Sequence, residues 1–172
     1  MTPMEMELDP PNGVTGFEFG MPAEEVKRAA AAIGEVNVRD EGSASLWSQM
    51  EIDVVHPRFA VTFNIDDGKT LSSVEVWRPQ PGPKEVTITW RGIDIFDTPA
   101  DEVMDAIEAA GHPITDRESF NPIVPHLSLA FTRDPADDIP FNDNNMPMYF
   151  TSVLAGPTAY YDEFLNSVAA EL

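Results

Sequence analysis

Apolar residues recur at helical spacing in two separate segments of the chain. In each segment they follow the i, i+3, i+4, i+7 order that places them on one face of an amphipathic helix. A proline stands at the start, acidic residues occupy the first turn, where they favour the positive end of the helix dipole, and a glycine follows the last turn. The sequence therefore predicts helices over 22–33 and 99–110, the second capped by Thr98, with apolar faces formed by Val26, Ala29, Ala30 and Ile33 and by Val103, Ala106, Ile107 and Ala110.

Alternating apolar and polar residues predict strands in both halves of the chain. The clearest pair is 59–63 and 71–77, which flank the turn residues Asp66-Asp67-Gly68 and so predict an antiparallel hairpin. In the second half, 127–131 and 149–154 alternate in the same way, with a much longer segment between them. Further strands are predicted over 35–39, 46–55 and 86–90.

The two halves also share a short motif ahead of each predicted helix. In 16–26 and again in 92–103, a glycine precedes an apolar–acidic–apolar triplet, and Pro-Ala, two carboxylates and a valine follow. Internal similarity of this kind is typical of a repeated structural unit. We therefore expect an α+β fold of two tandem repeats, each a helix packed on an antiparallel β-meander or hairpin. Whether the repeats form one continuous sheet is left open by the sequence.

Proline and acidic residues suggest where these units begin and end. Residues 1–13 are rich in Pro, Met and acids and are expected to form a flexible tail, while 14–79 would be the first repeat. The Pro-rich segment 80–84 is the expected connector, because so many prolines cannot continue a central strand. The second repeat, 85–172, contains the acidic loop 132–147 and ends in a predicted closing helix that begins at Tyr160. A loop of that length is usually functional or disordered.

The repeat resembles the beta-lactamase inhibitor protein and its single-unit relatives, the BamE-type lipoproteins. The resemblance lies in Gly20-Met21-Pro22-Ala23-Glu24-Glu25-Val26, which is similar to the Gly-Met-Thr-x-x-x-Val opening of those domains, and in the strand–Asp-Gly–strand pattern of 59–76. The second copy departs from it with Phe96-Asp97-Thr98, and the cysteines of those families are missing. The resemblance implies the fold and protein recognition on an open sheet face. It assigns no functional residue.

Charge is the most unusual feature of the composition. The 172 residues include 10 Lys and Arg but 30 Asp and Glu, which gives a formal net charge of −20. Such a chain is not expected to bind nucleic acid or anionic membranes, which require cationic side chains. The charge favours a basic protein partner reached by electrostatic steering, or mimicry of a nucleic acid's field. The other explanation is that it serves solubility or adaptation to salty conditions. No apolar run approaches membrane-spanning length, and the acidic N-terminal segment does not look like a signal peptide, so we expect a cytoplasmic protein.

The sequence offers little evidence of catalysis or cofactor binding. It has no cysteine, no Gly-x-Ser-x-Gly and no phosphate-binding glycine loop. His56, His112 and His126 lack metal-ligand spacing, and the carboxylates of 132–147 lack the calcium-loop pattern. We therefore assign no catalytic residue, no metal and no cofactor, although an active site need not be local in sequence.

Aromatic residues near acids are the best candidates for a binding surface, because aromatic anchors dominate protein interfaces. We assign partner binding to Trp47, Trp77, Trp90, Asp137, Asp138, Phe141, Asp143 and Tyr149. The expected function is a non-enzymatic protein-binding module, an acidic inhibitor or immunity-type protein that neutralises a basic partner, and acts as monomer or homodimer. The alternative is a small-ligand-binding protein or enzyme with a pocket between the repeats, using carboxylates and His56 or His126.

Overall fold

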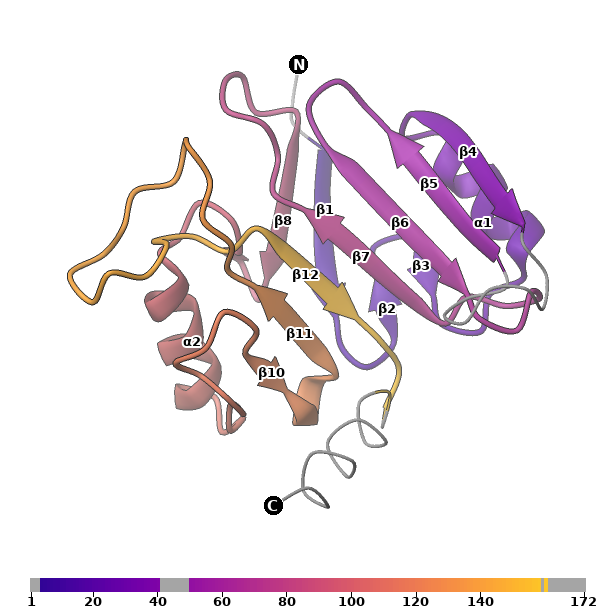
Figure 1. The fold of residues 1–172 in the computed structure, drawn as a ribbon. Coiled ribbons are helices and arrows are strands. Elements are labelled where there is room, and N and C mark those ends of the chain that lie inside the picture. The colour runs from indigo at the N-terminus through magenta and orange to yellow at the C-terminus, as the bar shows by residue number, and fades with distance from the viewer. Residues whose placement is uncertain (1–3, 41–49, 159, 161–172) are drawn as a thin grey trace.

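The computed structural model describes residues 4–40, 50–158 and 160. The predicted closing helix, apart from Tyr160, and the N-terminal part of the strand predicted over 46–55 lie outside these residues. The described part is an α+β fold with two helices and two sheets, one of seven strands and one of five. In Figure 1 the smaller sheet lies behind the middle of the larger one.

The larger sheet is antiparallel throughout and combines strands from both halves of the chain. Both predicted hairpins are confirmed, because β6 pairs with β7 and β11 pairs with β12. The two hairpins join where β7 pairs with β12, with Val76 opposite Val153. The strand order is β10 (Ile123–Val124), β11 (Leu129–Thr132), β12 (Ser152–Ala155), β7 (Ser73–Trp77), β6 (Ala60–Ile65), β5 (Met50–Val55) and β4 (Glu35–Asp40).

The smaller sheet corrects the prediction of a flexible tail over residues 1–13. Residues Met4–Asp9 form β1, which pairs in parallel with β8 (Val86–Trp90) and lies at the centre of the five-stranded order β3 (Phe17–Glu18), β2 (Gly13–Val14), β1, β8 and β9 (Ile93–Asp94). Met6 and Leu8 are buried, whereas Glu5, Glu7 and Asp9 are exposed. This is the period-two pattern of a half-buried strand, and a partner strand about 80 residues away completes it.

The two helices form where the spacing predicted them. They span α1 (Ala23–Ala31) and α2 (Ala100–Ala109), and their buried residues are Ala23, Val26 and Ala30 in α1 and Ala100, Val103, Met104 and Ile107 in α2. The N-cap residues are Pro22 and Pro99, so Thr98 is not the cap. Helix α1 contacts β4 and β5, and α2 lies at the other end of the large sheet (Figure 1). Neither helix is long and apolar enough to cross a membrane.

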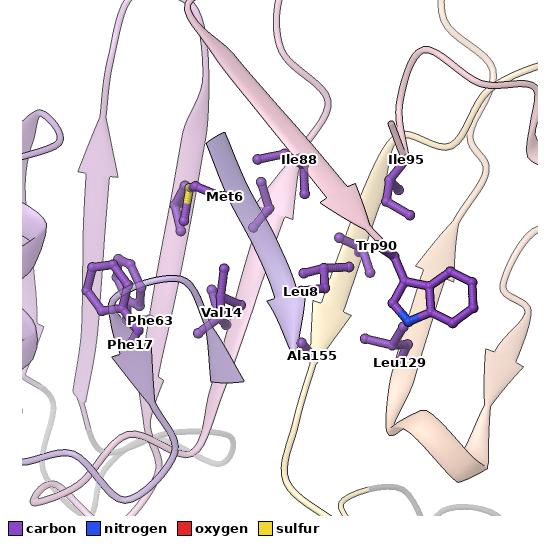
Figure 2. Close-up of a cluster of buried hydrophobic side chains, with 14 of the residues drawn as sticks. Met6, Leu8, Val14, Phe17, Phe63, Ile88, Trp90, Ile95, Leu129 and Ala155 are labelled. Atoms are coloured by element: carbon purple, nitrogen blue, oxygen red, sulfur yellow. The ribbon is translucent and has the colours of Figure 1, made fainter. Parts of the chain in front are cut away.

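One hydrophobic core joins all these elements. The rings of Phe17 and Phe63, from different sheets, lie 4.2 Å apart between centroids. Met6 and Leu8 of β1 extend this contact towards Leu129 of β11, as Figure 2 shows. Because residues from both halves of the chain enter the same cluster, neither half has a separate core.

Candidate functional site

The structure separates the predicted partner-binding residues into exposed and buried ones. Trp77 and Phe141 are 37% and 51% exposed, and Asp137, Asp138 and Asp143 also lie on the surface. Tyr149 is half-buried, and Trp47 lies outside the described residues.

Trp90 is only 3% exposed, so its assignment to a binding surface is wrong. It lies on the same face of β8 as Val86 and Ile88, which are also buried, and it belongs to the shared core (Figure 2). Its ring meets the His112 ring edge-on at 6.4 Å and carries the Arg91 guanidinium at 4.9 Å.

Trp77 borders an open groove where the two halves of the chain meet. One wall is the segment that leaves β7, and the other belongs to the loop 132–147. The groove has a volume of about 230 Å³ and is lined by Trp77, Arg78, Pro79, Gln80, Pro81, Ala136, Asp138, Ile139 and Thr151. We call it the Trp77 groove.

Backbone hydrogen bonds hold the proline-containing wall of the groove. Arg78 N–H donates to the carbonyl of Thr151 at 2.8 Å, which continues the β7–β12 ladder by one residue. Gln80 N–H donates to the Arg58 carbonyl at 2.7 Å, and Arg58 Nη1 donates to the Pro81 carbonyl at 2.9 Å. The segment 78–81 is therefore fixed on both sides, although its prolines supply no donors.

Arg78 connects this wall to the acidic loop at the base of the groove. Its Nη1 donates to Asp138 Oδ2 at 2.8 Å, and its Nη2 lies 4.0 Å from Asp97 Oδ1. The guanidinium also lies over the Tyr149 ring, 5.2 Å from the centroid. Tyr149 and Asp138 therefore position Arg78, a role that differs from the direct partner contact expected from the sequence.

Arg133 holds the base of the loop from inside. It is 2% exposed, and its Nε donates to the Pro147 carbonyl at 2.5 Å, which closes the loop across its two ends. Its Nη1 donates to Asp101 Oδ1 at 3.1 Å, and Asn142 Nδ2 donates to Asp101 Oδ2 at 3.0 Å. The loop is thereby attached to the first turn of α2, with Ile139 buried beneath it and Asp134 and Asp137 facing solvent.

A second, smaller cavity is also lined by segment 78–81. It has a volume of about 120 Å³, and Lys84 forms ion pairs there with Asp94 and Asp97. Burial lowers the pKa of Lys84, but the hydrogen bonds and charges of the two carboxylates outweigh it and raise the pKa above its ordinary value. In this cavity the Lys84 ammonium group is therefore charged and paired with both carboxylates.

The histidines do not form a site with these cavities. Neither the Trp77 groove nor the smaller cavity is lined by a histidine. His56 Nε2 lies 3.1 Å from Glu85 Oε2, and the rings of His112 and His126 are 5.9 Å apart. The pKa of His112 is lowered by burial, by the Arg91 charge and by His126, so the neutral ring is favoured. Among the described residues, no group of three or more His, Asp or Glu side chains could hold a metal ion.

The sequence did not identify several residues that build the groove. Arg78 and Pro79 fall at the end of the predicted first repeat, Pro81 falls in the predicted connector, and the sequence pattern gives Arg133 and Ile139 no role. One signal was available: Arg133 is the only basic residue within 132–147, so a carboxylate partner could have been expected for it.

Comparison with known proteins adds no assignment, because no family model, no curated protein and no solved structure matches the chain. The resemblance to the beta-lactamase inhibitor protein therefore remains a prediction.

Proposed function

We propose that this protein is a non-enzymatic binding module that docks a protein partner through the Trp77 groove. The observation that carries the proposal is an indole 37% exposed beside a groove whose two walls are held in place. Tryptophan is the residue type most enriched among interface residues that dominate affinity. A groove fixed before binding also lowers the entropy lost on association.

Charge supports a basic partner. The loop acids Asp134, Asp137 and Asp143 form no ion pair within the described part of the chain, which includes all ten Lys and Arg residues. Together with the net charge of −20, these exposed carboxylates would attract a cationic protein and accelerate its approach. An inhibitor or immunity-type role fits this combination of acidity and a preformed groove.

The architecture supports a related proposal, that the chain contains two copies of one unit. In each half a glycine with positive φ, Gly16 at 82° and Gly92 at 80°, precedes a two-residue strand, a proline N-cap and a helix. A hairpin follows each helix, and the two hairpins pair through β7 and β12. The Trp77 groove opens beside this junction, so a duplicated unit would create a surface that a single copy lacks.

Affinity capture with matched variants tests the function. Wild-type protein, Trp77→Ala and Phe120→Ala would be immobilised in low salt and exposed to lysate of the source organism. Phe120 is a suitable control because it is 45% exposed and does not line the groove. We expect a basic protein that is retained by wild type and Phe120→Ala, lost with Trp77→Ala, and eluted by moderate salt. Equal retention by all three would refute the proposal.

A further inference from the structure

Trp77 lines the same groove as Asp138, and no Lys or Arg side chain lies over its ring. Elsewhere in the chain, Arg91 lies over Trp90 and Arg78 lies over Tyr149. These are the cation–aromatic contacts of the described residues, which include every Lys and Arg of the sequence. Trp77, the exposed member of the three aromatic residues, is therefore left with a ring available to a cation from outside.

The walls of the groove suit the stem of a long cationic side chain. Pro79 and Pro81 on one side and Ala136 and Ile139 on the other present mainly apolar surface. The volume of about 230 Å³ is below the roughly 300–1,000 Å³ of pockets that enclose whole small molecules. The groove is therefore sized for one or two side chains of a larger partner.

The rim supplies the complementary charge. Asp138 is already paired with Arg78, which neutralises the guanidinium at the base of the groove. Asp137 stands between Ala136 and Asp138, which both line the groove, and is exposed without an ion pair. Asp134 is also exposed, and its backbone N–H donates to Oγ1 of Thr151, another lining residue, at 3.2 Å. A cation entering along the apolar walls would meet these two unpaired carboxylates.

We propose that the Trp77 groove binds an arginine side chain presented by the basic partner. The aliphatic stem lies between the proline wall and Ile139, the planar guanidinium stacks on Trp77, and its donors face Asp134 and Asp137. Arginine fits better than lysine because its flat, weakly hydrated head stacks on an indole and can donate two parallel hydrogen bonds to a carboxylate. This inference rests on the proposed function and names the chemistry that the site recognises.

An NMR titration tests it without knowledge of the partner. Uniformly ¹⁵N-labelled protein would be titrated with acetyl-tetra-arginine-amide, and with the tetra-citrulline and tetra-lysine analogues. Citrulline keeps the shape of arginine and lacks its charge. The readout is the indole N–H signal of Trp77, assigned by its absence in Trp77→Phe. We expect a saturable shift with arginine, an at least threefold weaker response to lysine, and none with citrulline.

Two variants sharpen the result. Asp134→Asn combined with Asp137→Asn should weaken arginine binding at least threefold, whereas Glu5→Gln combined with Glu7→Gln, on the exposed face of β1, removes the same charge and should leave it unchanged. Equal responses to arginine and lysine, a response to citrulline, or shifts confined to β1 with Trp77 unmoved would overturn the inference. If the arginine inference is overturned but Trp77→Ala still abolishes capture of the partner, the proposed binding function stands. If Trp77→Ala leaves capture unaffected, the proposed function and the arginine inference both fail.

Discussion

Glu75 lies on the face of β7 turned away from the shared core, yet its carboxylate is half-buried. Burial raises its pKa above the ordinary value, and the nearby charge of Glu51 raises it further. A carboxyl whose pKa is higher in the folded state favours folding most when it is protonated. Its contribution to the free energy of unfolding is therefore lost as pH rises through the folded-state pKa.

We predict that Glu75→Gln raises the melting temperature at pH 7, because the amide removes the cost of burying an ionised group. Glu18→Gln is the matched control, since it changes the net charge equally at an exposed position. The advantage of Glu75→Gln over this control should disappear near pH 3. Thermal unfolding of both variants between pH 7 and pH 3 measures this advantage. A difference in melting temperature that does not change with pH would contradict a raised pKa of Glu75 as its cause.

The contrast between Trp77 and Trp90 shows what single residues reveal in advance. Both tryptophans end a strand and precede an arginine, so local composition treats them alike. Position within the alternation separates them, because Trp90 is in phase with the buried Val86 and Ile88 whereas Trp77 is out of phase with Val74 and Val76. The strand pattern therefore predicts that Trp90 is buried, whereas its place at a strand end does not distinguish it from Trp77.

At the scale of elements, the loop 132–147 depends on contacts that the sequence pattern does not specify. Its length and acidity were evident, but the contacts of Arg133 with Pro147 and Asp101 arise only when the loop returns to α2. Strand β1 was missed for the same reason, since its partner β8 is distant in sequence. Local patterns predicted elements that form with near neighbours, such as α1, α2 and the β6–β7 hairpin.

We predict that Arg133→Met lowers the free energy of unfolding by about 2 kcal/mol, since the variant keeps the stem but loses charged hydrogen bonds. Amide hydrogen exchange should increase first at Met146 and Met148, whose N–H groups donate within the loop to Asn142 and Pro140. Arg133→Lys should recover part of the protection.

The comparison for that experiment is Arg39→Met. Arg39 is also paired with acids, Glu51 and Asp53, but its side chain is 60% exposed. Exposed ion pairs contribute roughly 0–1 kcal/mol, so the change should be small. Equal losses in the two variants, or unchanged exchange in the loop, would show that Arg133 does not hold it.

At the scale of the whole molecule, a single hydrophobic core is surrounded by a large excess of negative charge. Elements from both halves enter that core, and a net charge of −20 surrounds it. Repulsion between carboxylates opposes the compact state, and dissolved salt screens it. The join of β7 to β12 and the parallel pairing of β1 with β8 could not be predicted, because many registers satisfy the same alternation.

We therefore predict that the melting temperature rises between 20 mM and 300 mM NaCl, by roughly 2–4 °C or about 1 kcal/mol for a chain of this length. KCl should act equally, because screening does not depend on the cation. The variant with Glu5, Glu7 and Glu18 all changed to Gln should respond less. A melting temperature that is constant or falls with salt would mean that repulsion between carboxylates does not reduce the stability of the folded chain.

Site-specific photocrosslinking in the source organism tests the central claim most directly. A benzophenone amino acid would replace Gln80, an exposed residue that lines the groove, in one variant and Phe120 in another, with Trp77 retained in both. Adducts would be identified by mass spectrometry after irradiation. The account predicts that position 80 crosslinks to one basic protein through a peptide containing arginine, and that position 120 does not. The same adducts at both positions, or none at position 80 while the protein is folded, would contradict it.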